Sequence, residues 1–169
     1  MGDGDLAEIF RLVPDTSAAV TVANDRFAAL LAQLTPLLPP GTEIRHVGAT
    51  AVPGCLTKGD LDIAVRTQRQ AFQACDTILA QRFPRNTGSV RTADFAAFED
   101  AGSFPQAGIQ LVVIGSAYDD FHRFTEILRA DPAILAAYND LKRRFDGQPM
   151  AAYREAKGTF VERALRRGK

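Results

Sequence analysis

The stretch from Asp60 to Arg66 restricts the fold more than any other part of the sequence. Apolar residues occupy every second position from Leu61 to Val65, which is typical of a β-strand with one face on a hydrophobic core. Asp60 and Asp62 would share the opposite face, although aspartate is disfavoured in strands. The pattern therefore predicts a strand that carries two neighbouring carboxylates on the face away from the core.

A turn of small residues precedes this strand. Residues 48–54 read GATAVPG and follow a short predicted strand at 42–47. Such a turn offers unhindered backbone N–H groups to phosphate oxygens, and two carboxylates at positions i and i+2 of a strand can hold one or two divalent cations. Together the two features indicate metal-dependent phosphoryl or nucleotidyl transfer, in which Mg²⁺ would bridge the carboxylates and a triphosphate.

The rest of the chain alternates between helical and extended patterns. Residues 1–20 look like a loosely organised lead-in, and residues 86–98 are ambiguous but favour an extended chain. Helices are expected at 22–38, at 68–81, from a capping box at Ser116 and Asp119 to about 130, at 131–145, and up to about 166, with a buried strand at 108–114. The sequence predicts one α/β (α+β) domain over residues 1–169, a small mixed β-sheet flanked by helices with a helical C-terminal region.

Charge and composition narrow the class of partner. Twenty basic and twenty acidic residues give a net charge of +0, so no overall attraction to nucleic acid or to an anionic membrane is expected. No stretch approaches the roughly 20 apolar residues of a membrane span, and the N-terminus lacks the order of a signal peptide, which predicts a cytoplasmic protein. The two cysteines, Cys55 and Cys75, suggest neither a disulfide framework nor a zinc site.

The spacing of the turn and the strand resembles the signature of nucleotidyltransferases, in which an apolar-Gly pair precedes Asp-apolar-Asp by about a dozen residues. More closely, His46 to Gly54 resembles the HVGSTAVPG block of GrpB proteins, and Lys58 stands where that family has a lysine. The resemblance extends to 121–131, 137–142 and 153–160, and so covers nearly all of the chain from residue 22. It implies a nucleotidyltransferase-like fold that binds a nucleoside triphosphate with Mg²⁺. If active, such a protein would transfer a nucleoside monophosphate to an unknown small-molecule acceptor.

The resemblance also assigns roles to individual residues. Asp60 and Asp62 would be the metal ligands and catalytic carboxylates. Tyr153 and Lys157 share one helix face and could reach toward a base or phosphate, although a packed tyrosine and a solvated lysine are the usual state of such residues. The remaining residues expected to contact the nucleotide or its phosphates are Gly48, Ala49, Thr50, Lys58 and Gln110.

Three departures from the family pattern leave the activity open. Ala49 replaces a serine, Asp60 replaces an apolar residue and so completes the carboxylate pair, and Gln110 stands where active enzymes carry a further carboxylate. Glutamine offers a carbonyl oxygen to a cation but cannot act as a general base. Asp94, Glu99 or Asp100 could substitute. The alternative to an enzyme is therefore a degenerate, non-catalytic nucleotide-binding or regulatory module, and a homodimer interface also stays open.

Overall fold

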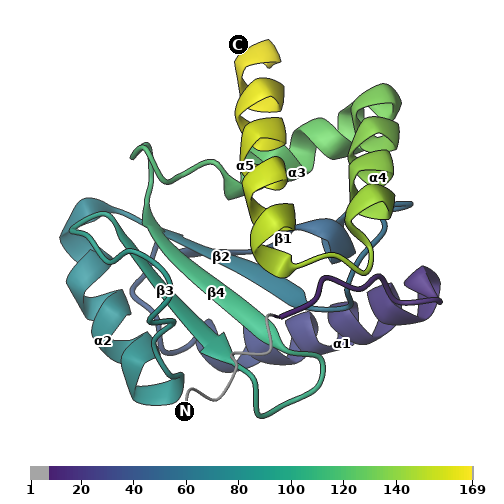
Figure 1. Ribbon diagram of the computed structural model, residues 1–169. Helices are drawn as coiled ribbons and strands as arrows, with labels where there is room; N and C mark the ends of the chain where they lie inside the picture. The colour runs from purple at the N-terminus through teal and green to yellow at the C-terminus, as the bar shows by residue number, and fades with distance from the viewer. Residues whose placement is uncertain (1–7, 169) are drawn as a thin grey trace, which may run out of the picture.

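The computed structural model describes residues 8–168, and a four-stranded β-sheet forms its centre (Figure 1). In order across the sheet the strands are β1 (Glu43–Val47), β2 (Leu61–Thr67), β4 (Ala107–Val113) and β3 (Phe95–Asp100). The α-helices are α1 (Thr16–Leu34), α2 (Phe72–Arg82), α3 (Phe121–Ala130), α4 (Pro132–Phe145) and α5 (Met150–Arg167), and short 3₁₀ turns lie at Ala49–Ala51 and Arg69–Ala71. The predicted mixed sheet flanked by helices is confirmed.

The sheet is mixed because its central pair is parallel and its outer pairs are antiparallel. β2 runs parallel to β4, whereas β1 pairs antiparallel with β2 and β3 pairs antiparallel with β4. The parallel register places Asp62 opposite Gly108, and Ala64 opposite Gln110. Side chains at paired positions point to the same side of a sheet, so Asp62 and Gln110 share one face.

Helices cover the two faces of the sheet differently. Leu61, Ile63 and Val65 point to the face covered by α1 and α2, where they belong to the largest buried cluster of apolar side chains. Figure 1 shows α3, α4 and α5 on the other side of the sheet. We call this second side the open face, because Asp62 and Gln110 lie there in a cavity rather than in the core.

The first helix begins earlier than the sequence predicts. It starts at Thr16 rather than at residue 22, because the Asp15 side chain accepts a hydrogen bond from the Ala18 N–H (2.9 Å) and caps the helix. Of the expected lead-in, residues 1–7 lie outside the described residues. The segment from 8 to 15 packs closely on the C-terminal helices, and Phe10 is only 1% exposed.

The N-termini of α3 and α4 test two predictions. Asp131 caps α4 by accepting from the Ala133 and Ile134 amides, with Pro132 directly after it, as expected. The capping box of Ser116 and Asp119 is wrong: α3 begins after Asp120, and the Asp119 carboxylate binds Arg66 instead. Within residues 8–168, no helix combines the length and the apolar character needed to cross a bilayer.

Candidate functional site

Two glycines enclose the carboxylate of Asp62. A Cβ atom on Gly48 would lie 2.6 Å from Asp62 Oδ2, and one on Gly108 would lie 3.2 Å from Oδ1. Gly48 also has a φ of 78°, a conformation that other residues adopt only with strain. The turn and β4 therefore approach Asp62 so closely that neither glycine can carry a side chain without displacement.

The charge of Asp62 is poorly compensated. Burial first, and then the negative charge of Asp60, raise the pKa of its carboxyl, and the charges of Lys157, Lys58 and Lys142 oppose them, so that the pKa is about 6. Within the described residues no donor forms a hydrogen bond to this carboxylate. A half-buried carboxylate with this environment gains from any cation that binds it.

The two carboxylates open into different cavities. Asp62 lines a cavity of about 540 Å³ on the open face, which we call the Asp62 cavity. Asp60 lies directly before β2 and lines a neighbouring cavity of about 580 Å³. Its carboxylate lies 3.5 Å from the Lys58 ammonium, which lines the same neighbouring cavity. The structure thus places Asp60 and Lys58 beside the Asp62 cavity rather than inside it.

The turn after β1 is held by side chains. The Gly48 N–H donates to the Thr125 hydroxyl on α3 (3.1 Å), and Ala49 lines the Asp62 cavity. Thr50 is 2% exposed, and its hydroxyl lies 2.8 Å from His46 Nε2 and donates to the Asp60 carbonyl (3.3 Å). The Thr50 hydroxyl therefore fixes the turn from within and does not line the cavity.

Gln110 lies at the centre of the open face. It pairs with Ala64 on one side and with Ala97 on the other, and it lines the Asp62 cavity. Its Oε1 atom is buried and has no hydrogen-bond partner in the described part of the chain. An unpartnered buried carbonyl is costly unless a ligand or a cation completes its coordination.

The helix α5 contributes Lys157 but not Tyr153 to the Asp62 cavity. Tyr153 is 5% exposed, stacks on Phe10 with ring centres 3.8 Å apart, and has its hydroxyl 3.3 Å from that of Tyr138. Lys157, one helical turn later, lines the cavity together with Asp62. Tyr153 thus supports the helix from the core, while Lys157 places a positive charge at the site.

Sequence reasoning missed Lys142 on α4. It is 3% exposed, its ammonium donates to the Leu56 carbonyl (2.6 Å), and it lies 4.5 Å from the centre of the Tyr138 ring. Burial lowers the pKa of Lys142 to about 8. The signal was its position four residues after Tyr138 on the apolar face of a predicted helix, where a lysine needs a specific partner.

Sequence reasoning also missed three aromatic side chains at one end of the Asp62 cavity, which we call the aromatic wall. Phe95, Tyr118 and Phe121 line the Asp62 cavity, with ring centres 5.1 Å apart for Phe95 and Tyr118 and 6.2 Å for Phe95 and Phe121. Phe95 begins β3, a strand that the ambiguous pattern of 86–98 did not delimit. Phe121 is 37% exposed and presents apolar surface to the cavity.

The oxygen donors of the site fit a small divalent cation better than a transition metal. Within residues 8–168, no group of three or more His, Cys, Asp and Glu side chains lies close enough to hold a metal ion. Asp62 and the Gln110 carbonyl nevertheless supply two oxygen donors on adjacent strands. Mg²⁺ is commonly held by one or two protein oxygens together with waters and substrate phosphates, so the pair fits that ion.

Comparison with known structures defines the class of fold. The chain is similar to the crystal structure of conserved protein GrpB from Enterococcus faecalis, with 17% identity, a TM-score of 0.69 and coverage of 86% of this chain and 94% of that one. It is also similar to the Cid1 poly(U) polymerase solved with MgGTP bound, with 13% identity, a TM-score of 0.50 and coverage of 70% of this chain and 40% of Cid1. The chain thus has a nucleotidyltransferase-like fold, a four-stranded mixed sheet flanked by helices.

Sequence comparison then identifies the family. The family model described as GrpB protein matches residues 20–167. A UPF0157 protein of Vibrio cholerae is 31% identical over 129 residues, which cover 76% of this chain and 68% of the relative. The chain belongs to the GrpB family.

Proposed function

We propose that this protein binds a nucleoside triphosphate together with Mg²⁺ in the Asp62 cavity and transfers the nucleoside monophosphate to a small acceptor. One observation carries the proposal: Asp62 and Gln110, whose side-chain oxygens accept no hydrogen bond from residues 8–168, line the same cavity as the aromatic wall. The cavity volume of about 540 Å³ lies within the range of small-molecule sites. A polar end for phosphates and a flat apolar end for a base match the two ends of a nucleotide.

The dimensions of the sheet agree with this arrangement. Phe95 pairs with Val112 on β4, which pairs with Arg66 on β2, four residues after Asp62. With about 3.3 Å per residue along a strand and about 4.8 Å between strands, the Cα atoms of Asp62 and Phe95 lie about 16 Å apart. This separation suits an extended nucleoside triphosphate with its base on the aromatic wall and its phosphates near Asp62.

Each residue of the site would have a distinct task. Asp62 and the Gln110 carbonyl would hold Mg²⁺, and the bound cation would neutralise part of the phosphate charge. Lys157 would pair with phosphate oxygens, and Gly48 would allow the turn to approach them. In the transfer, an acceptor oxygen bonds to the α-phosphorus as the bond to pyrophosphate breaks. Gln110 cannot take the acceptor proton, and Asp60 lines the neighbouring cavity, so the proton would pass to solvent water.

Thermal unfolding tests the binding. We expect one nucleoside triphosphate, with Mg²⁺ but not with EDTA, to raise the Tm of the wild type, because a ligand that binds only the folded state stabilises it by mass action. Asp62→Asn should lose this Mg²⁺-dependent rise. Asp140→Asn, at an exposed aspartate paired with Arg143, is the matched control and should retain it. A rise of equal size in Asp62→Asn would contradict the assignment of the site.

A second function, nucleotide binding without transfer, is favoured by Gln110. Gln110 stands where active enzymes carry a carboxylate. The Asp60 carboxylate is ion-paired with the Lys58 ammonium at 3.5 Å. Pyrophosphate release from the stabilising nucleotide, measured with a panel of alcohols and phosphates, separates the two functions. Release that requires both Mg²⁺ and Asp62 supports the transferase, and a Tm rise without any release supports the binding module.

A further inference from the structure

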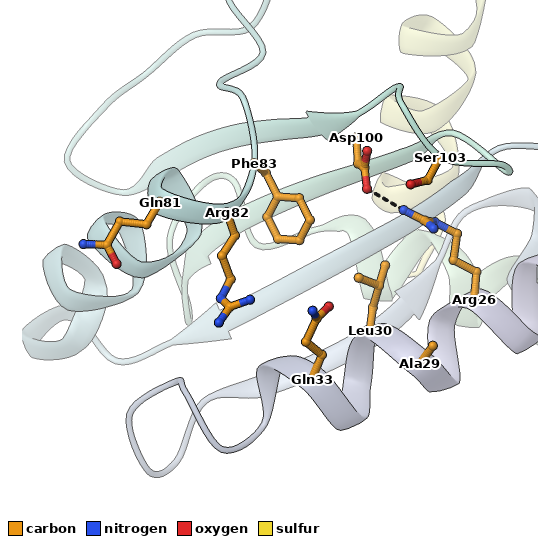
Figure 2. A pocket seen from close by; sticks show the side chains of 9 residues that line it. All are labelled: Arg26, Ala29, Leu30, Gln33, Gln81, Arg82, Phe83, Asp100 and Ser103. Carbon is orange, nitrogen blue, oxygen red and sulfur yellow. Dashed lines mark hydrogen bonds and ion pairs between the residues drawn. The ribbon is translucent and has the colours of Figure 1, made fainter.

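A separate polar cavity lies on the side of the sheet that α1 and α2 cover. Its volume is about 660 Å³, and it is bordered by α1, the end of α2 and the end of β3 (Figure 2). We call it the Arg82 cavity. Its polar side chains come from all three elements and from the segment after β3: Arg26, Gln33, Gln81, Arg82, Asp100 and Ser103. The Asp62 cavity shares none of these residues.

The polar groups of this cavity supply more hydrogen-bond donors than acceptors. Among its described lining residues Asp100 alone is acidic, and its Oδ2 accepts from Arg26 Nη2 at 2.5 Å. Arg82 takes part in none of the ion pairs found within residues 8–168. Because the Arg26 charge is neutralised by Asp100, the cavity keeps one positive charge and the five N–H donors of the Arg82 guanidinium.

The donors surround an apolar floor. Leu30 and Phe83, which are 6% and 8% exposed, belong to the core beneath the sheet and also line the cavity. Figure 2 shows the ends of the Arg82 and Gln33 side chains directed into the same space from α2 and α1. A ligand there would meet cationic and amide donors at the sides and apolar side chains below.

We propose that the Arg82 cavity binds a small anionic molecule through a carboxylate or phosphate group, held by the Arg82 guanidinium and the Gln33 amide. Arginine suits such a group because its planar fork donates two parallel hydrogen bonds to two oxygens of one anion. Arg26 stays paired with Asp100. The Arg82 cavity and the Asp62 cavity lie on opposite sides of the sheet, so a ligand in one does not contact a ligand in the other.

An NMR titration with two inorganic or simple organic probes tests the site. Sodium phosphate and sodium citrate are added at matched ionic strength, with sodium chloride as the reference, while the Nε–H signal of Arg82 and the side-chain amide of Gln33 are followed. We expect a saturable shift of these signals with one of the probes. Saturation by phosphate identifies a phosphate-bearing ligand, and saturation by citrate identifies a carboxylate-bearing one.

Variants at Arg82 distinguish a specific binding site from nonspecific electrostatic attraction of anions. Arg82 is exposed, so its replacement is expected to leave the fold intact. Arg82→Gln should weaken the affinity at least about tenfold, and Arg82→Lys should weaken it less because it keeps the charge but loses the fork. Arg91→Gln, at an arginine outside the cavity, and Asp62→Asn should bind as the wild type does. The proposal is overturned if neither probe saturates, if chloride produces the same shifts, or if Arg82→Gln binds as tightly as the wild type.

Discussion

Gly48 meets a requirement of the backbone and one of the neighbouring carboxylate. Its φ of 78° suits glycine, and a Cβ atom would lie 2.6 Å from Asp62 Oδ2. We expect Gly48→Ala to lower the free energy of unfolding by about 1–3 kcal/mol, measured by urea denaturation. Gly158→Ala, on α5 with no atom within 4 Å of the new Cβ, should instead raise it by about 0.5–1 kcal/mol. Equal stability of Gly48→Ala and the wild type would show that the turn can withdraw from Asp62.

Asp62 itself destabilises the folded protein when no cation is bound. Its pKa is about 6 in the folded state, against an ordinary value of about 3.9 in the unfolded chain. Because the folded state binds the proton more tightly, stability from this group is complete below about pH 4, falls between about pH 4 and 6, and stays lost above that. In EDTA at pH 8, Asp62→Asn should therefore be more stable than the wild type by about 1–3 kcal/mol.

The measurement is chemical denaturation of both proteins across this pH range. The difference between them should close below about pH 4, where the wild-type carboxyl is protonated as well. A variant that is less stable than the wild type at pH 8 would mean that the Asp62 charge is compensated in the folded protein.

At the scale of elements, the strand alternation predicted β2 and its two faces, and the buried run at 108–114 predicted β4. Asp62 and Gln110 come together because these strands are parallel neighbours, whereas the family resemblance implied only that Gln110 lies at the site. The aromatic wall depends on Phe95 in β3, and on Tyr118 and Phe121 around the start of α3. No local pattern marks these positions, since their proximity comes from the tertiary pairing of β3 with β4. Asp119 was misassigned for the same reason: its partner is distant in sequence.

The contact between Asp119 and Arg66 ties the β4–α3 connection to β2. Arg66 Nε and Nη2 donate to the two oxygens of Asp119 at 2.7 and 2.8 Å, and the Gly115 N–H donates to Asp119 Oδ2 at 2.9 Å. Replacing Asp119 by alanine leaves Arg66 without its bidentate partner in a buried place, at an expected cost of about 3–5 kcal/mol in thermal or urea unfolding. Asp140→Ala, which breaks an exposed pair with Arg143, should cost less than about 0.5 kcal/mol.

At the scale of the whole molecule, the segment before α1 joins the start of the described chain to the start of α5. The Phe10 N–H donates to the Gln148 carbonyl (2.9 Å), the Met150 N–H donates to the Glu8 carbonyl (2.7 Å), and Ile9 forms an isolated bridge with Pro149. The sequence suggested a loose lead-in because glycine and proline interrupt any regular pattern there. Its order comes from contacts with α5 that local sequence does not encode.

Phe10 is the side chain on which this junction depends. It is 1% exposed and stacks on Tyr153, so Phe10→Ala should destabilise the protein by about 3–5 kcal/mol in urea denaturation. Ile9→Ala, at a neighbour that is 38% exposed, serves as the control and should cost much less. Comparable losses for the two variants would show that the backbone bonds, rather than the ring stack, hold the segment.

The same contact can form only once the start of α5 has been synthesised. Phe10 packs on Met150 and Tyr153, which are synthesised about 140 residues after it. At a synthesis rate of about 5–20 residues per second, this aromatic side chain is without its partners for on the order of ten seconds. Until then it is exposed apolar surface, so the nascent chain, rather than the finished protein, is the form most open to chaperones and to aggregation.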